Sequence, residues 1–164
     1  MAKEKTLEDL FHDHLKDIFY AEKKILKSLP KMAKAAQSKA LKAAVEKHRG
    51  ETEVHVQRLE KVFDIFGKRA QGKTCPAIDG ILKEGDETLK DYKGMAALDA
   101  GIIASAQAVE HYEITRYGTL KRWAETLGMS DAARLLGQTL GEESKTDQAL
   151  DGLAESANPA ALAA

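Results

Sequence analysis

The stretch that decides the fold covers residues 106–120 and reads AQAVEHYEITRYGTL. Val109 and Tyr117 are eight residues apart, which places both on one face of an α-helix. Glu113 falls on that same face, between the two apolar residues, and Glu110 lies one turn earlier on its flank. The stretch therefore predicts a long helix whose inward face carries acid as well as apolar side chains.

The composition of the whole chain favours an all-α domain. A chain of 164 residues fits one domain and can bury a substantial core. Its hydrophobic fraction of 43% is ordinary, but aromatic residues make up only 5% and there are only 3 prolines. Ala, Leu, Lys and Glu dominate instead, and these are good helix formers, so an all-β fold is nearly excluded.

Apolar residues recur at steps of three and four along most of the chain, which predicts four long helices and one short helix. Pro30 falls inside the first long helix, where we expect a kink or an early stop near Ser28. Asn158 and Pro159 are expected to end the last helix before a loose tail at 158–164. The expected helices cover residues 6–36, 40–66, 76–92, 96–127 and 131–157.

The helix lengths and connections predict how the domain is arranged. The four long helices form two pairs with short turns, and the short helix at 76–92 lies in the long connection between the pairs. Two antiparallel helical hairpins joined by such a crossover have the ferritin-like four-helix-bundle topology. We therefore expect residues 1–164 to form a single ferritin-like bundle domain.

Every predicted long helix carries acid on or beside its inward face, and the acids are predicted to lie at similar heights. Glu22 is sixteen residues before the turn near Ser38, and His55 is seventeen after it. Around the turn near Met129, Glu113 is sixteen residues before and Glu143 is fourteen after. Because a helix rises about 1.5 Å per residue, these side chains should meet at one level of the bundle.

Converging carboxylates in a dry interior would repel one another, and inward Lys and Arg are scarce on these faces, so metal is the simplest countercharge. Carboxylate and imidazole ligands suit iron or manganese, and two ions fit a four-helix bundle. His48-x-x-Glu51 and Glu51-x-x-x-His55 are alternative contributions from the second helix, and Tyr117 could donate to a ligand carboxylate or relay electrons. The predicted ligands are Glu22, Glu51, His55, Glu110, Glu113, Glu143 and Asp147.

Five segments carry a family resemblance, and they read AEKKILKSLPKMAKAA, HRGETEVHVQRLE, CPAIDGILKEG, AQAVEHYEITRYGTL and EESKTDQAL. At these segments, which span nearly the whole chain, it resembles the YciE/YciF family of ferritin-like proteins; VEHYEI followed by YGTL is the most specific string. The resemblance implies a bacterial stress-associated setting, homodimers and a ferroxidase-like role with two metal ions. The chain departs from well-studied di-iron bundles, because it lacks their recurring Glu-x-x-His unit.

Charge and sequence composition also limit the partners. Lys and Arg number 25 against 26 Asp and Glu, and the C-terminus has no basic tail, so neither nucleic-acid binding nor Dps-like DNA protection is expected. No apolar stretch approaches the length of a membrane span, and the start of the chain is charged, which predicts a cytoplasmic protein without a membrane partner. A single cysteine, Cys75, offers no thiolate cluster for a metal.

Two functions are consistent with the sequence. The first is oxidation of Fe(II) with O₂ or peroxide at a carboxylate-bridged pair of metal ions, by a possible enzyme of the ferroxidase type. The alternative is a non-enzymatic, dimeric helical bundle, a stress or structural protein whose metal site is vestigial or empty.

Overall fold

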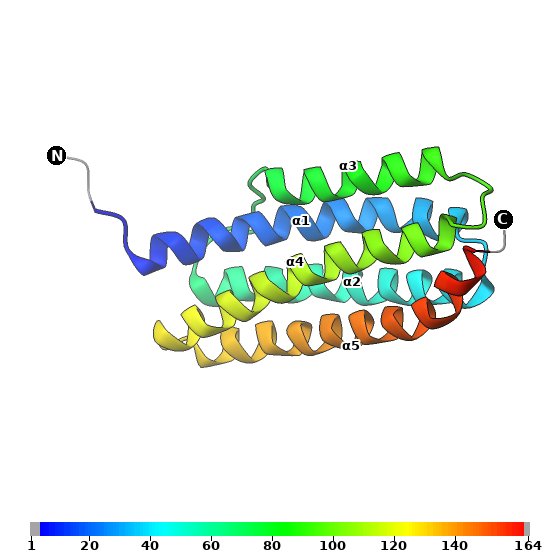
Figure 1. Ribbon diagram of the computed structural model, residues 1–164. Helices are drawn as coiled ribbons and strands as arrows, with labels where there is room; N and C mark the ends of the chain where they lie inside the picture. The colour runs from blue at the N-terminus through cyan, green and yellow to red at the C-terminus, as the bar shows by residue number, and fades with distance from the viewer. Residues whose placement is uncertain (1–3, 163–164) are drawn as a thin grey trace.

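The computed structural model describes residues 4–162, which form five helices and no strand (Figure 1). The prediction of an all-α bundle with one short crossover helix is confirmed. The helices are α1 (Leu7–Ala35), α2 (Lys39–Phe66), α3 (Pro76–Asp91), α4 (Leu98–Thr126) and α5 (Ser130–Ala160).

The four long helices form the bundle, and α3 lies outside it. Helix α1 packs against α2, and α4 packs against α5, as the two hairpins of the sequence prediction. The hairpins meet where α2 packs on α5 and α1 packs on α4. Helix α3 covers the groove between α1 and α4 (Figure 1). This arrangement forms one interior, which is lined by side chains from all four long helices.

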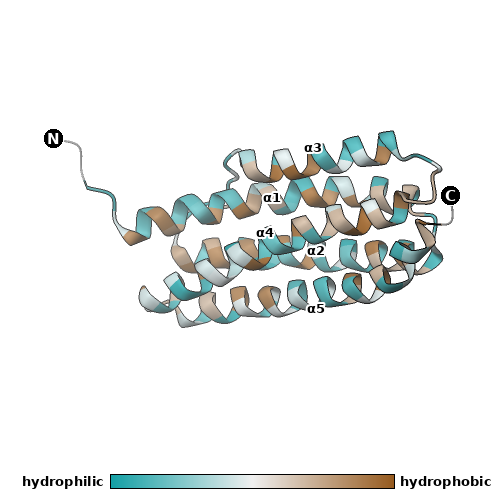
Figure 2. Ribbon diagram, in the orientation of Figure 1, coloured by the Kyte–Doolittle hydropathy of each residue, from teal (hydrophilic) through white to brown (hydrophobic). Residues whose placement is uncertain are grey.

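Apolar side chains fill both ends of that interior. Hydrophobic and hydrophilic residues alternate in turns along each helix, as amphipathic helices require (Figure 2). Near the end of the bundle where α1 begins, Phe11 stacks on Phe66 with ring centroids 5.2 Å apart, and Phe19 meets Phe63 at 5.4 Å. Phe11, Phe19 and Phe63 are buried, and each contributes on the order of 2 kcal/mol through the hydrophobic effect.

Local signals in the sequence determine where the helices begin and end. Thr6 caps α1 by accepting the backbone N–H of Asp9, while the Asp9 carboxylate accepts the backbone N–H of Thr6. Gly67 ends α2 with φ of 75°, a left-handed conformation that glycine adopts without strain. Cys75 caps α3, because its Sγ accepts the backbone N–H of Ile78. Cys75 is thus a buried packing and capping residue.

Proline ends neither of the helices in which it was expected to act as a stop. Helix α1 continues through Pro30 to Ala35, because Pro30 removes only one backbone donor while Leu29 and Met32 on either side are buried in the core. Helix α5 likewise continues through Pro159 to Ala160, so the predicted stop at residue 158 is wrong and the helix takes in part of the expected tail. Residues 163–164 of that tail lie outside the described residues.

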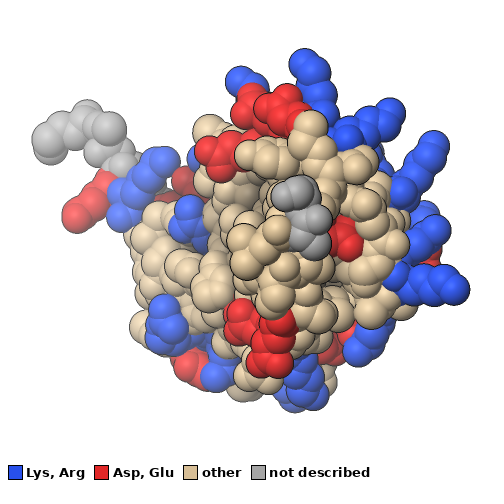
Figure 3. Space-filling view, turned by 45° about the vertical axis from the view of Figure 1, so that its right-hand side comes forward, with Lys and Arg blue, Asp and Glu red and all other residues tan. Residues whose placement is uncertain are grey.

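The outer surface is charged and mixed. Lys and Arg lie among Asp and Glu over the face shown in Figure 3. Several of these charges pair between neighbouring elements, as Lys31 on α1 does with Asp86 on α3. Within the described chain, no helix is both long enough and apolar enough to cross a lipid bilayer.

A surface carboxylate fixes the turn between α1 and α2 to the start of α4. The two oxygens of Asp99 accept the backbone N–H groups of Gln37 and Ser38, each at 2.8 Å. Asp99→Ala should therefore lower the free energy of unfolding by about 1–3 kcal/mol, as measured by urea denaturation. Asp91→Ala, at an exposed site on α3, is the control and should change it by less than about 0.5 kcal/mol. Equal effects of the two substitutions would contradict the role given to Asp99.

Candidate metal centre

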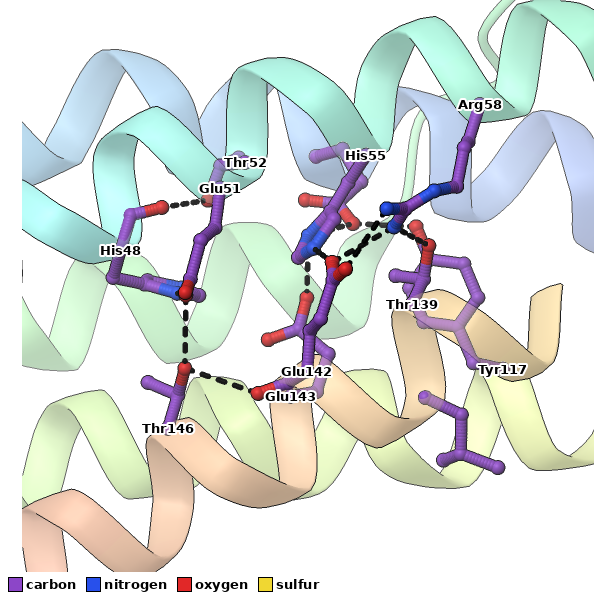
Figure 4. Close-up of polar contacts among 12 residues, drawn as sticks. His48, Glu51, Thr52, His55, Arg58, Tyr117, Thr139, Glu142, Glu143 and Thr146 are labelled. Carbon is purple, nitrogen blue, oxygen red and sulfur yellow. Dashed lines mark hydrogen bonds and ion pairs between the residues drawn. The ribbon is translucent and has the colours of Figure 1, made fainter. Parts of the chain in front are cut away.

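Halfway along the bundle, the apolar core gives way to ionisable side chains. Six of them are buried at this level, with at most 5% of each residue exposed, and they come from all four long helices. Part of the cluster is drawn in Figure 4. The six are Glu22 from α1, His48 and His55 from α2, Glu110 and Glu113 from α4, and Glu143 from α5.

Helical spacing explains why these side chains face inward. Glu22 lies between the buried residues Ile18 and Ile25, four residues after one and three before the other. His48 and His55 are seven residues apart, two turns of α2, and so lie on one face of that helix. Each acid or imidazole therefore takes a position that an apolar side chain would occupy in an ordinary bundle.

The six side chains form two groups that share one residue. In each group, one ligand atom from every residue lies within 4.8 Å of all the others. Glu143 belongs to both groups, so its carboxylate lies within reach of the ligand atoms of each. The first group is His48, Glu110, Glu113 and Glu143, and the second is Glu22, His55 and Glu143.

Many polar atoms in the cluster have no hydrogen-bond partner in the described chain. They include both oxygens of Glu113 and both oxygens of Glu143. His55 Nδ1 lies 2.8 Å from Glu143, and His48 Nε2 lies 2.9 Å from Glu110, but neither contact has the geometry of a hydrogen bond. Native interiors rarely leave buried polar atoms unpaired. Carboxylate oxygens and imidazole nitrogens that converge without forming hydrogen bonds to one another are suited to bind a cation.

The electrostatics of the carboxylates point the same way. Burial raises the pKa of Glu113 well above its ordinary value, and the neighbouring carboxylates of Glu143, Glu22 and Glu110 raise it further. Burial also raises the pKa of Glu143. Both shifts favour the protonated form of the carboxylates when no metal is present, and a bound cation would favour the deprotonated form.

The two histidines carry positive charge in the metal-free cluster. Burial alone would lower the pKa of His55, but its contacts with Glu143 and Glu22 raise it to about 10. Burial likewise opposes protonation of His48, whose pKa is nevertheless raised well above its ordinary value by Glu110 and Glu51. Glu22 behaves in the opposite way: burial raises its pKa, but contacts with His55, Glu113 and Tyr117 together outweigh burial and lower it. Protons on imidazole thus compensate part of the acid when no metal is present.

Tyr117 is a buried core aromatic whose hydroxyl contacts a predicted ligand carboxylate, which was one of the alternatives left open by the sequence. Its hydroxyl is fully buried and donates to Glu22 Oε1 at 2.5 Å. Burial and the nearby carboxylates of Glu22 and Glu113 raise the pKa of Tyr117, which keeps the hydroxyl protonated. Tyr117 therefore fixes the orientation of Glu22.

Two of the predicted ligands lie outside the cluster. The side chain of Glu51 is 28% exposed, and its carboxylate contacts Lys47, His48 and Thr146 at the edge of the site (Figure 4). Asp147 was expected to face inward with Glu143, but its carboxylate instead accepts from Gln107 at 3.2 Å and lies 3.0 Å from His111 Nε2 on the flank of α4 and α5.

The geometry of α5 explains the error for Asp147. Four residues rotate a helix by about 40° more than one full turn, which places Asp147 beside the inward face that Glu143 occupies. On α2, both His48 and His55 lie in the cluster. Glu51 lies between them in the sequence, but its side chain lies at the edge of the site.

Glu142, which was not predicted from the sequence, contacts the outer nitrogen of His55 and so helps to orient this imidazole. Glu142 Oε2 lies 2.8 Å from His55 Nε2, and Arg58 donates to both oxygens of Glu142 at 2.7 and 2.8 Å (Figure 4). A proton on Nε2 directed at Glu142 leaves Nδ1 facing Glu22 and Glu143, as metal-binding imidazoles require. The sequence signal is weak, because Glu142 only adjoins Glu143 and Arg58 only follows His55 by one turn.

Comparison with protein families shows which family the chain belongs to. Residues 6–163 match the model of a family described as "Domain of unknown function (DUF892)". The chain belongs to the DUF892 family. Its match covers all five helices, including the whole candidate metal centre.

The bundle is similar to solved structures of bacterial proteins. Protein YciF of Escherichia coli K12 is 39% identical over 151 residues, which are 92% of this chain and 91% of YciF. The crystal structure of YciF, a stress protein, matches with a TM-score of 0.91 at 38% identity over 95% of this chain and 99% of that one. YcfI of Rhodopseudomonas palustris, described as a proposed structural protein, matches with a TM-score of 0.87 at 47% identity, over 90% and 94% of the two chains.

The raised pKa of His55 predicts how the stability of the metal-free protein depends on pH. Between pH 6.5 and 10 the folded protein retains a proton on His55 that the unfolded chain has lost, so the free energy of unfolding falls as the pH rises. His48, Glu113 and Glu143, whose pKa values are also raised, act in the same direction.

Urea denaturation with a chelator present, at pH 6.5 and pH 9, measures this effect. The midpoint should be lower at pH 9, and His55→Gln should make the change smaller. Stability that rises between these two pH values in the metal-free protein would show that the histidines are not held protonated by the buried acids.

Proposed function

We propose that this DUF892 protein binds two iron or manganese ions at the buried cluster and oxidises Fe(II) with O₂ or peroxide. The observation that supports the proposal most strongly is that Glu143 belongs to both groups of converging donor atoms. A carboxylate shared in this way would serve as a ligand to both ions, as the inward carboxylates of metal-binding four-helix bundles can. When bound, the pair of ions would supply two one-electron reductants side by side for an oxidant.

The ligand set fits two divalent ions in charge as well as in geometry. Four buried carboxylates carry four negative charges when deprotonated, and two divalent cations would neutralise them while both histidines are neutral. Carboxylate oxygens with one imidazole at each position suit iron or manganese. The proposed ligands are Glu22 and His55 for one ion, His48, Glu110 and Glu113 for the other, and Glu143 for both.

The residues around the cluster would hold these ligands in position. Tyr117 donates to Glu22, and Glu142, itself paired with Arg58, lies against the outer nitrogen of His55. Burial of the whole group keeps water away, which strengthens the attraction between carboxylate and cation. Glu51 and Asp147, predicted as ligands from the sequence, are given no metal in this proposal because their carboxylates face other partners.

One comparison favours the alternative, a bundle with a structural role. YcfI of Rhodopseudomonas palustris is described as a proposed structural protein, and it is 47% identical to this chain. In that case the protonated histidines and carboxylates would compensate the buried charge without a metal. The cytoplasmic location predicted from the sequence, and the bacterial stress setting and homodimer implied by the family resemblance, belong to both alternatives and stay predictions.

Anaerobic titration with Fe(II) distinguishes the two functions. Binding should saturate at about two Fe(II) per chain, and admitting air should produce the near-ultraviolet absorbance of Fe(III) bound to carboxylates. Glu143→Gln should abolish binding of at least one ion, because it removes the shared ligand. Glu51→Gln and Asp147→Asn are the matched controls and should leave the stoichiometry unchanged.

Two results would contradict the proposal. One is protein that takes up no Fe(II) or Mn(II) at the cluster under anaerobic conditions. The other is a Glu143→Gln variant that binds and oxidises iron as the unmodified protein does.

A further inference from the structure

An apolar cavity adjoins the metal cluster in the half of the bundle that contains the turn between α1 and α2. Its volume is about 250 Å³. All five helices contribute to its wall, mostly with aliphatic side chains. Representative lining residues are Ile25 and Met32 from α1, Leu82 from α3, Val109 from α4 and Leu150 from α5.

The cavity wall is polar where it meets the cluster. Glu110 and His48 both line it, and both belong to the first group of converging donor atoms. Glu51 and Glu142 also line it. Glu110 is 1% exposed, and its Oε2 has no hydrogen-bond partner in the described chain. An acceptor oxygen is therefore available to a molecule in the cavity that carries an O–H donor.

The cavity also approaches solvent between α2 and α5. Lys47 on α2 and Lys145 on α5 line it and are exposed, and the half-buried Thr146 lines it as well. A small molecule could enter between α2 and α5 at this point. Its apolar part would then lie among the aliphatic residues, and its polar end would reach Glu110.

Size and polarity define the class of ligand. A cavity of 150 Å³ accommodates benzene, so 250 Å³ has room for about six to ten carbon atoms. O₂ and hydrogen peroxide are both far smaller than this space, and hydrogen peroxide, which is polar, gains nothing from an apolar wall. The unpaired Oε2 of Glu110 needs a donor, and an ionised carboxylate or phosphate head group brings only acceptor oxygens, so a neutral head group with an O–H fits beside it.

We propose that the cavity binds a neutral alkyl hydroperoxide, whose O–O–H end lies at Glu110 and His48 and whose hydrocarbon part fills the space between Ile25, Val109 and Leu150. Reduction of this molecule breaks its O–O bond. Two electrons come from two Fe(II) ions and two protons come from solvent, and the products are the alcohol, water and two Fe(III) ions. The bound oxidant is thus an organic peroxide.

Binding and reduction are separable parts of this inference. Binding of a neutral alkyl compound depends only on the cavity and can be measured on the metal-free protein. The reduction step rests on the proposed function, because the electrons come from Fe(II) at the cluster.

The binding test uses 1-hexanol, hexanoate and ethanol with metal-free protein at pH 8, followed by NMR of the methyl groups. 1-Hexanol should cause saturable shifts at Ile25, Met32 and Leu150, while hexanoate and ethanol should bind at least about tenfold more weakly. Ala106→Leu fills part of the cavity and should weaken 1-hexanol binding about tenfold. Ala108→Leu makes the same change at an exposed position of α4 and should have no effect.

The binding proposal is overturned if 1-hexanol causes no saturable shift at these methyl groups, or if it binds Ala106→Leu as well as it binds the unmodified protein. Ala44→Leu fills the cavity from α2 and gives the same information if Ala106→Leu does not fold.

The redox test mixes anaerobic, Fe(II)-loaded protein with hexyl hydroperoxide or with hydrogen peroxide and follows Fe(III) formation by stopped flow. In Ala106→Leu the rate with hexyl hydroperoxide should fall about tenfold while the rate with hydrogen peroxide is unchanged. Equal changes for the two oxidants would overturn the alkyl hydroperoxide assignment and leave the metal centre intact. Protein that takes up no Fe(II) would overturn the proposed function, and the 1-hexanol experiment would still decide the cavity.

Discussion

The burial of acid at one level of a helical bundle is the constraint on which the rest of this structure depends. Four carboxylates and two imidazoles occupy positions that hydrocarbon would otherwise fill, and removing such groups from water costs several kcal/mol each. The apolar layers on both sides supply the stability that tolerates this cost. Outer contacts such as the pair of Arg58 and Glu142 hold the ligands in place, so the charged layer is fixed in geometry before any ion binds.

Much of this layer follows from the sequence because helical periodicity is regular over long helices. Glu22, Glu113 and Glu143 were predicted to face inward at one height, and the structure brings them together. The prediction that Asp147 faces inward is wrong, because Asp147 is four residues after Glu143 and this step rotates the helix about 40° past a full turn, toward the flank. The contact of Glu142 with His55 could not be predicted, because it depends on how α2 packs against α5 and no local sequence pattern encodes that packing. Helix ends were predictable at Gly67, where backbone conformation decides, but not at prolines, where packing overrides a single lost hydrogen bond.

The cavity gives the metal centre an asymmetric environment. On one side the cluster borders Tyr117 and the packed aromatic end of the core, and on the other it borders an open space lined by aliphatic side chains. A void of this size costs stability, because the side chains around it lose dispersion contacts. Small residues such as Ala44 and Ala106 on its wall keep the space open where larger ones would close it. The sequence gives no sign of it, since a void depends on how five helices pack.

X-ray diffraction from crystals soaked anaerobically in Mn(II), with anomalous data at the manganese edge, tests the central claim most directly. The account predicts two anomalous peaks about 3.5–4 Å apart, with Glu143 between them, Glu22 and His55 beside one, and His48, Glu110 and Glu113 beside the other. Peaks only at partly exposed carboxylates such as Glu51 or Asp147, or no peak within the bundle, would show that protons and not metal ions compensate the charge of the buried acids.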